Sequence, residues 1–291
     1  MNAPRSCPRS RRSGHVNASE KLASVAETVL DEAARRLLDA ARSGVPCPPV
    51  RDLLGSTDLE AAYAVQARLT AARTAAGARI FGRKIGLTSE AVQRQIGVDQ
   101  PDFGVLFDDM AFSDGDAVPF GAVLQPKAEA EVAFVLKDDL ADGDLDVAQV
   151  RAAIDYAVAA VEVCGSRVAG WDISFADMVA DNASSGVYVL GVERRGLDDF
   201  EPVSVQMSMT VDGVEVSSGN GAACLGDPLN AVVWLARKAR EFGAPLRAGQ
   251  VALSGALGPM ATITPGATVS VTISGLGAVS ADFPAIDQEN A

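Results

Sequence analysis

The chain has 291 residues, of which 48% are hydrophobic, so it can bury a substantial core as one large domain or as a domain with an appendage. Its formal net charge of −13 argues against nucleic acid or an anionic membrane as a partner, because both are held mainly by Lys and Arg. The sequence has no run of about 18 uninterrupted apolar residues, so it offers no membrane span, and we expect a cytoplasmic protein.

Histidine and cysteine usage narrows the chemistry further. The single histidine, His15, argues against a Ser-His-Asp or Cys-His triad and against a His-based zinc site. Any general acid–base catalysis must then use carboxylates, Lys, Tyr or metal-bound water. The four cysteines (Cys7, Cys47, Cys164 and Cys224) are scattered without a CxxC pair, which predicts a reducing compartment. We expect Cys164 and Cys224 to be small, buried, apolar residues.

The N-terminal third is predicted to be helical after a tail. Residues 1–18 are rich in Arg and Ser, contain no acid and lack the apolar core of a secretion signal. We expect a disordered tail or an upstream start codon, with an organelle transit peptide as the alternative. Apolar residues near a 3.6-residue period predict helices from Ser19 to about Gly44 and over 58–76, which together form a helical N-terminal part over 19–77.

After Gly77 the pattern favours strands over helices. Helices are predicted over 88–96, 147–162 and 227–242, and Asp212-Gly213 is typical of a tight hairpin turn. The predicted strands are 79–87, 131–137, 187–190, 203–211, 214–217, 250–254, 268–273 and 278–283. This pattern predicts an α+β protein with a β-roll or barrel-like core over 78–286. No GxGxxG or P-loop motif is present, which argues against nucleotide chemistry.

Two carboxylates stand at the start of a strongly apolar strand. Glu129 and Glu131 are two residues apart, so their side chains lie on one face of the strand and repel each other unless a cation neutralises them. Oxygen-only ligands favour a hard cation, Mg²⁺ or Mn²⁺. The alternative is a solvated strand end with both acids facing water.

Other segments also carry chemically useful side chains. Lys84 lies between glycines in a predicted strand, and Asp102 lies in a predicted loop beside Pro101. A surface lysine and a turn-forming acid are the alternatives for these two positions. Glu162 follows an apolar run, where its burial is costly without a cation or strong hydrogen bonds. The glycine-containing segments 180–186 and 254–260 suit backbone contact with a small anion, although the first is equally well explained as a structural turn.

Taken in order, these segments closely resemble the 2-keto-4-pentenoate hydratases, within the larger fumarylacetoacetate hydrolase superfamily. The resemblance runs from about Gly82 to Phe283 through the motifs GRKIGLT, QPDFG, AEAEVAFVL, VEVCGSR, ADNASSGVYVLG, CLGDPLNAVVWLARK and SGALGPM. It implies a mixed β-roll fold and a divalent metal, Mg²⁺ or Mn²⁺, held by three carboxylates. The matching positions are Glu129, Glu131 and Glu162.

The resemblance also implies a reaction, the addition of water to 2-hydroxypenta-2,4-dienoate to give 4-hydroxy-2-oxopentanoate in the meta-cleavage degradation of aromatic compounds. It assigns the proton transfers to Lys84 and Asp102, and we expect the pKa of Lys84 to be lowered beside a metal-bound substrate. Backbone amides of the segment 254–260 are expected to line the substrate carboxylate. The positions concerned are Ser254, Gly255, Gly258 and Met260.

Several alternatives remain open from the sequence. A 2-oxo-3-hexenedioate (4-oxalocrotonate) decarboxylase shares the expected metal site, but it needs a further cation for the second carboxylate of its substrate, and Arg83 and Arg167 are available. A hydratase for a longer dienoate and a metal-free, non-catalytic partner subunit are the others. The lack of a histidine in the resembling region counts against C–C bond hydrolysis. The resemblance further implies a homo-oligomer and an association with a decarboxylase or an aldolase of the same pathway.

Overall fold

The structure is a computed structural model that describes residues 18–89, 93–94 and 98–285, with side chains from residue 26 onward. The predicted tail, except for its last residue, lies outside the described residues. So do His15, the side chain of Ser19 and most of the helix predicted over 88–96.

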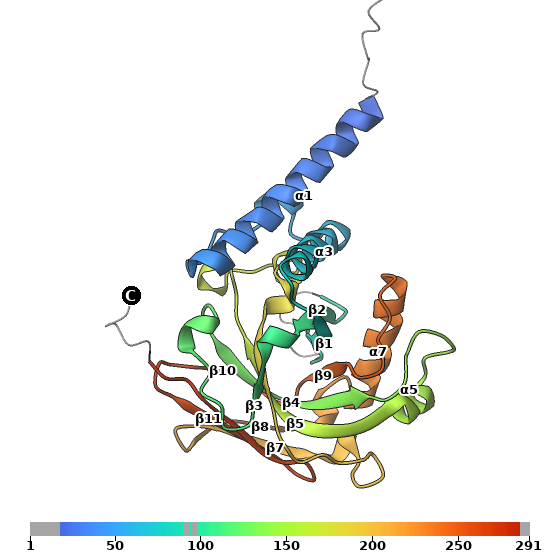
Figure 1. Ribbon diagram of the computed structural model, residues 1–291, viewed down its shortest axis with the longest axis vertical. Helices are drawn as coiled ribbons and strands as arrows, with labels where there is room; N and C mark the ends of the chain where they lie inside the picture. Colours follow the sequence, from blue (N-terminus) through green and yellow to red (C-terminus); the bar gives the residue numbers. More distant parts are fainter. Residues whose placement is uncertain (1–17, 90–92, 95–97, 286–291) are drawn as a thin grey trace, which may run out of the picture.

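The N-terminal part is helical, as predicted. Helix α1 (Ala18–Ser43) projects from the end of the molecule, and α3 (Leu59–Ala75) lies between α1 and strands β1 and β2 (Figure 1). The Asp58 side chain caps α3 by accepting a hydrogen bond from the Ala61 amide. The short helix α2 (Arg51–Leu54) was not predicted. These helices share a core with α6 (Phe175–Ala180), which comes from much later in the sequence.

The rest of the described chain forms two sheets with few helices, which confirms the predicted α+β class. The larger sheet has the strand order β2-β1-β9-β4-β5-β6-β3, with β10 paired to β4, and the smaller has the order β12-β11-β7-β8. The larger sheet consists of β1 (Ile80–Gly86), β2 (Asp102–Phe107), β3 (Ala111–Ser113), β4 (Lys127–Leu136), β5 (Ile154–Cys164), β6 (Ser185–Leu190), β9 (Val251–Ala256) and β10 (Ala261–Thr262). The smaller consists of β7 (Gln206–Val211), β8 (Val214–Asn220), β11 (Thr268–Ile273) and β12 (Gly277–Asp282).

Two of the predicted elements are confirmed closely. The hairpin between β7 and β8 turns at Asp212 and Gly213, whose φ angles of 52° and 78° are those of a two-residue turn with both central residues left-handed. Helix α7 (Pro228–Glu241) begins after Asp227, whose side chain accepts a hydrogen bond from the Leu229 amide. Among the described residues, no helix is both long enough and apolar enough to cross a membrane.

The helix predicted over 147–162 is wrong. Helix α5 ends at Ala153, and the chain continues as strand β5 (Ile154–Cys164). Nearly every residue of β5 is buried because both faces of the strand are covered, so residues 157–161 form an uninterrupted apolar run that shows no alternation. Such a run cannot be separated from a buried helix by periodicity. The correction matters because it places Glu162 on a strand.

The prediction of a loop around Asp102 is also wrong, because this residue lies on a strand. Strand β4 begins four residues earlier than predicted. Asp102 is the first residue of β2, directly after Pro101, and it pairs in register with Gly86 of β1. Strand β4 begins at Lys127, so Glu129 and Glu131 lie inside the strand. The backbones of Asp102, Glu129, Glu131 and Glu162 are therefore all fixed by the hydrogen bonds of the sheet.

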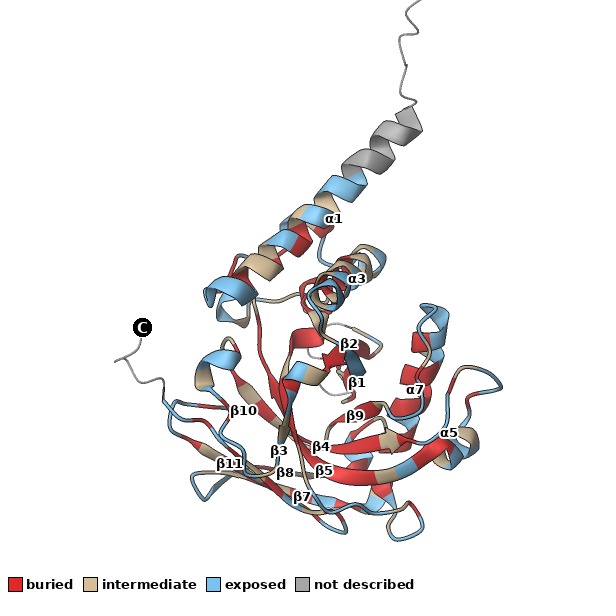
Figure 2. Ribbon diagram, viewed as in Figure 1, coloured by how far each residue is buried: buried red, intermediate tan, exposed pale blue. Residues whose placement is uncertain are grey.

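Strands β4 and β5 divide the molecule into two sides. They are buried along most of their length (Figure 2). On one face, residues such as Phe134, Val161 and Val163 join the core formed with the smaller sheet and α7. On the other face, Ala133 and Ala160 pack in a separate apolar cluster with residues of β2, β6 and β9. The carboxylates of β4 and β5 lie on this second face, because side chains alternate along a strand.

Asp177 of α6 ties the helical part to the rest of the chain. Its carboxylate is fully buried and accepts hydrogen bonds from the Val50 and Arg51 amides, each at 2.8 Å, and it forms an ion pair with the Arg51 guanidinium at 3.0 Å. It also accepts a hydrogen bond from the amide of Ser174, the residue that caps α6. One side chain thus fixes the start of α2 against α6.

Replacement of Asp177 by Ala should lower the free energy of unfolding by about 3 kcal/mol, because it leaves the amides of Val50, Arg51 and Ser174 without their acceptor and removes the buried partner of the Arg51 guanidinium. The matched control is Asp172→Ala, which removes the other partner of Arg51. The Asp172 side chain is 70% exposed, so that change should cost less than about 1 kcal/mol. Urea unfolding of both variants measures the difference, and equal losses would contradict this account.

Candidate active site

The site is built on a cross-strand pair of glutamates. Glu129 of β4 and Glu162 of β5 are directly opposite each other in the antiparallel ladder, and Glu131 lies one pair further along on the same face. Like charges directly opposite in a sheet are destabilising. Glu131 and Glu162 are at most 1% exposed, and Glu129 is half-buried. The sheet therefore holds three carboxylates together on its buried face.

A lysine and a fourth carboxylate reach this group from the neighbouring strands. Lys84 of β1 is 3% exposed, and its Nζ lies 3.2 Å from Glu162 Oε1. Asp102 of β2 is fully buried and lies over Gly86, where a Cβ atom would come within 2.2 Å of its Oδ1. The same Cβ atom would lie 3.4 Å from Lys84 Nζ, so Asp102 and Lys84 meet above this glycine.

The buried oxygen atoms of this group lack hydrogen-bond donors. Within the described part of the chain, neither oxygen of Asp102 or Glu162 accepts a hydrogen bond, and the same holds for Oε1 of Glu131. The other oxygen of Glu131 accepts a hydrogen bond from the Gly255 amide at 2.7 Å. Buried charged oxygens without donors are costly unless a cation satisfies them. Glu129 and Glu162 therefore offer oxygen ligands of the kind that a hard divalent cation prefers, and the place of Glu131 in such a site stays a prediction.

The pKa values of the carboxyl groups reflect their crowding. Burial raises the pKa of Asp102 to about 6, and the Lys84 ammonium opposes this shift only in part. Burial, reinforced by the negative charge of Glu162, raises the pKa of Glu129 to about 7. Burial and the neighbouring glutamates raise the pKa of Glu131 well above its ordinary range. Within the described part of the chain, the positive charge beside these groups is too small to keep all of them ionised.

The pKa of Lys84 is set by two opposing effects. Burial by itself lowers the pKa of this lysine, but the surrounding groups outweigh burial and raise the pKa well above its usual value. Those groups are Cys164, Glu162, Asp102 and Glu129. Among them the side chain is an ammonium at neutral pH, and the lowered pKa expected beside a metal-bound substrate stays a prediction.

In the segment 254–260, Gly255 contacts a site carboxylate, whereas the other three predicted residues have other surroundings. Gly255 of β9 donates its amide to Glu131, and a Cβ atom at this glycine would clash with the Thr88 side chain at 2.4 Å. Ser254 is fully buried and its carbonyl accepts a hydrogen bond from Cys224. Gly258 packs against β7 and β8, and Met260 is 44% exposed. Of the four predicted substrate-binding residues, the structure brings Gly255 against the carboxylates, and the roles of all four stay predictions.

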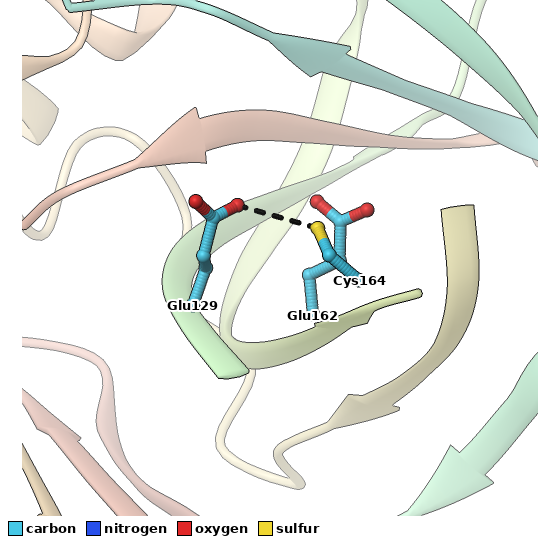
Figure 3. Close-up of side chains that lie close together, drawn as sticks. All are labelled: Glu129, Glu162 and Cys164. Carbon is cyan, nitrogen blue, oxygen red and sulfur yellow. Dashed lines mark hydrogen bonds between the residues drawn. The ribbon is translucent and has the colours of Figure 1, made fainter. Parts of the chain in front are cut away.

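Cys164 is the residue that the sequence reasoning missed. It is buried, as predicted, but its Sγ lies 3.5 Å from Glu129 Oε2 and 4.0 Å from Lys84 Nζ. Figure 3 shows the side chains of Glu129, Glu162 and Cys164 pointing toward the same space. The signal was available once β5 is read as a strand, since Cys164 follows Glu162 by two residues and must share its face.

Comparison with known proteins agrees with this architecture. A model of the fumarylacetoacetate (FAA) hydrolase C-terminal family matches residues 80–283, which include every residue of the site, and the chain belongs to this family.

Two curated relatives of the chain are named as hydratases, and a similar solved structure is a decarboxylase. The chain is 55% identical over 252 residues to the TodF product hydratase of Pseudomonas putida, covering 87% of this chain and 94% of that protein. It is 51% identical over 256 residues to the 2-keto-4-pentenoate hydratase of Paraburkholderia xenovorans, again covering 87% and 94%. Among solved structures, the 4-oxalocrotonate decarboxylase of Pseudomonas putida G7 complexed with magnesium and adipate has a TM-score of 0.84 and 34% identity. That match covers 88% of this chain and 97% of the other.

The raised pKa of Asp102 makes a prediction about stability without metal. Folding raises the pKa of Asp102 from near 4 in the unfolded chain to about 6 in the folded protein. Such a group destabilises the folded protein increasingly as the pH rises through this range. In EDTA, Asp102→Asn should therefore be more stable than the wild type at pH 8, by on the order of 2 kcal/mol, and closer to it at pH 4.5. Urea unfolding at both pH values measures this, and a variant with the wild-type dependence on pH would refute it.

Proposed function

We propose that this chain is a metal-dependent hydratase that adds water to 2-hydroxypenta-2,4-dienoate and forms 4-hydroxy-2-oxopentanoate. The observation that carries the proposal is the group of four carboxylates around Lys84, in which five buried oxygens, both of Asp102, both of Glu162 and Oε1 of Glu131, accept no hydrogen bond within the described part of the chain. It is supported by relatives named as hydratases at 50% identity or more across nearly their whole length.

Glu129, Glu131 and Glu162 are proposed to hold a divalent cation, Mg²⁺ or Mn²⁺. Oxygen donors on rigid neighbouring strands suit a hard cation, and the related decarboxylase was solved with magnesium. When bound, the cation supplies a Lewis acid that holds a 2-oxo acid and offsets the negative charge that develops on it during the reaction. The Gly255 amide fixes Glu131 in place, which is a positioning role.

Lys84 and Asp102 are proposed to move the protons. Hydration requires that the dienol lose its hydroxyl proton, that carbon 5 and then carbon 3 each gain one, and that water lose one as its oxygen bonds to carbon 4. At neutral pH the Lys84 side chain is an ammonium and can donate a proton, and the Asp102 carboxyl group, with a pKa of about 6, is ionised and can accept one. We therefore assign donation to carbon to Lys84 and acceptance from water to Asp102. Lys84 regains a proton from the dienol hydroxyl after the first donation and from Asp102 after the second, which returns both groups to their starting states.

The decarboxylase alternative needs a cation for a second carboxylate, and neither candidate arginine supplies it. Arg83 precedes Lys84 on β1, so its side chain lies on the opposite face, where it donates to the Ala244 carbonyl and lies over the Phe103 ring. Arg167 is already paired with the buried carboxylate of Asp181. Both observations favour a substrate with one carboxylate over a dicarboxylate related to adipate.

Other features of the proposal extend beyond the site. We infer a cytoplasmic enzyme of aromatic catabolism that acts as a homo-oligomer, with a decarboxylase or an aldolase of the same pathway as its partner. A hydratase for a longer dienoate would use the same residues. A non-catalytic subunit is disfavoured because Lys84, Asp102 and the three glutamates are all present and meet in one place.

Turnover tests the proposal directly. Purified protein with Mg²⁺ or Mn²⁺ should consume freshly generated 2-hydroxypenta-2,4-dienoate, with 4-hydroxy-2-oxopentanoate as the product, and EDTA should stop the reaction. Release of carbon dioxide from 2-oxo-3-hexenedioate, without hydration of the dienoate, would instead favour the decarboxylase. No metal-dependent turnover of either substrate would favour the non-catalytic reading.

Lys84→Met should lower kcat by about 100-fold or more, because the proton donor is lost while the shape of the side chain is roughly kept. The control is Lys137→Met, which changes an exposed lysine just after β4. Turnover of the Lys84 variant at the level of this control, with both proteins folded, would remove Lys84 from the mechanism.

Gly86→Ala tests Asp102 without replacing it. The added Cβ atom would lie 2.2 Å from Asp102 Oδ1, so the carboxylate must move. We expect kcat to fall by about tenfold or more, since small displacements of a catalytic group are costly. Gly196→Ala is the control, because the nearest atom there is at 3.7 Å. Equal turnover of the two variants in steady-state assays would contradict the role of Asp102.

A further inference from the structure

One thiol of this chain has unusual surroundings. Cys47 and Cys224 each donate to a backbone carbonyl, at 3.3 and 2.8 Å, as buried cysteines commonly do. Cys164 instead contacts Glu129 Oε2 at 3.5 Å and Lys84 Nζ at 4.0 Å, and it is 3% exposed. Among the cysteines whose side chains the structure describes, it alone has a hydrogen-bond contact with charged side chains.

A second, independent observation is that this thiol borders a buried carboxylate whose oxygens are incompletely satisfied. Glu162 is 1% exposed and aimed into the same space. Its Oε1 forms an ion pair with Lys84 Nζ at 3.2 Å, but neither of its oxygens accepts a hydrogen bond within the described part of the chain. One donor atom from each of Glu129, Glu162 and Cys164 can be chosen so that all three lie within 4.8 Å of one another (Figure 3). Two oxygens and one sulfur thus already surround a common point.

We propose that Cys164 is a soft donor in this site, and that with Glu129 and Glu162 it binds a thiophilic divalent cation, Zn²⁺ or Cd²⁺, in competition with Mg²⁺ or Mn²⁺. The inference rests on the carboxylate metal site of the proposed function. It adds that this chain has two modes of metal binding. A hard cation uses the carboxylates and leaves the thiol aside, whereas a soft cation recruits the sulfur.

The geometry is compatible with the soft mode. Ligands at about 2.0–2.3 Å from a tetrahedral ion lie about 3.3–3.8 Å apart, which the distance of 3.5 Å between Cys164 Sγ and Glu129 Oε2 already satisfies. Thiolate favours zinc and other soft ions, whereas carboxylate favours magnesium and manganese. As the sulfur–metal bond forms, the S–H bond breaks and its proton leaves to solvent. No oxidant or reductant is needed.

The test follows sulfur–metal bonding directly. The full chain carrying Cys7→Ser, which removes the thiol outside the described residues, is freed of metal and titrated with Cd²⁺. We expect an ultraviolet thiolate-to-cadmium charge-transfer absorption that saturates at one ion per chain and decreases when Mn²⁺ is added in excess. Adding Cys164→Ser should abolish the absorption and weaken Cd²⁺ binding by at least about tenfold more than Mn²⁺ binding.

Controls separate this proposal from its alternatives. Cys47→Ser should keep the absorption, and Cys164→Ala serves if the serine variant does not fold. X-ray absorption of the cadmium-loaded parent, which needs no variant of Cys164, should count one sulfur ligand. An absorption that survives loss of Cys164, or a parent that shows no sulfur ligand, overturns the proposal.

Hydration with Mg²⁺, measured on the same preparations, separates the proposed function from the inference about Cys164. Hydration without a cadmium signal overturns the inference about Cys164 alone. A cadmium signal without hydration overturns only the proposed function.

Discussion

The repulsion between Glu129 and Glu162 is the constraint on which the rest of the site depends. The register of β4 and β5 places the two glutamates opposite each other in a buried part of the sheet, and Glu131 stands beside them. With Asp102, four carboxylates face the single ammonium of Lys84, which leaves three negative charges uncompensated if all are ionised. A divalent cation removes two of these. The chain alone therefore relieves the strain only by keeping protons, as the raised pKa values of Asp102 and Glu129 show.

The fold makes this arrangement rigid by drawing on distant parts of the sequence. Strands β1, β9, β4 and β5 are neighbours in the sheet, although β9 comes more than a hundred residues after β4. Lys84 lies two strands away from β4, on the same face, and its Nζ still reaches Glu162. The opposite face packs against the smaller sheet and α7, so apolar burial there can offset the cost of the charged face. The site is thus costly in stability. The apolar core offsets part of this cost, and a bound cation would offset more.

Much of this could be predicted from the sequence, and the failures have physical causes. The spacing of Glu129 and Glu131 correctly placed both on one face, and Asp212-Gly213 and Asp227 marked a turn and a helix start. Glu162 was misplaced on a helix because β5 is buried on both faces and shows no alternation. That error also hid the position of Cys164.

The contacts of Lys84 with Glu162 and of Asp102 with Gly86 depend on the strand order, which local sequence patterns do not contain. Family resemblance grouped these residues, but it gave neither their distances nor the raised pKa of Lys84.

The central claim is that a divalent cation occupies the space between the carboxylates of β4 and β5. The most direct test is a crystal of the full chain soaked with Mn²⁺ and measured for anomalous scattering. The account predicts one strong peak per chain, contacted by carboxylate oxygens of Glu129, Glu131 and Glu162 at about 2.2 Å. A peak held by other residues, or no peak in this space while the crystal takes up Mn²⁺ elsewhere, would contradict it.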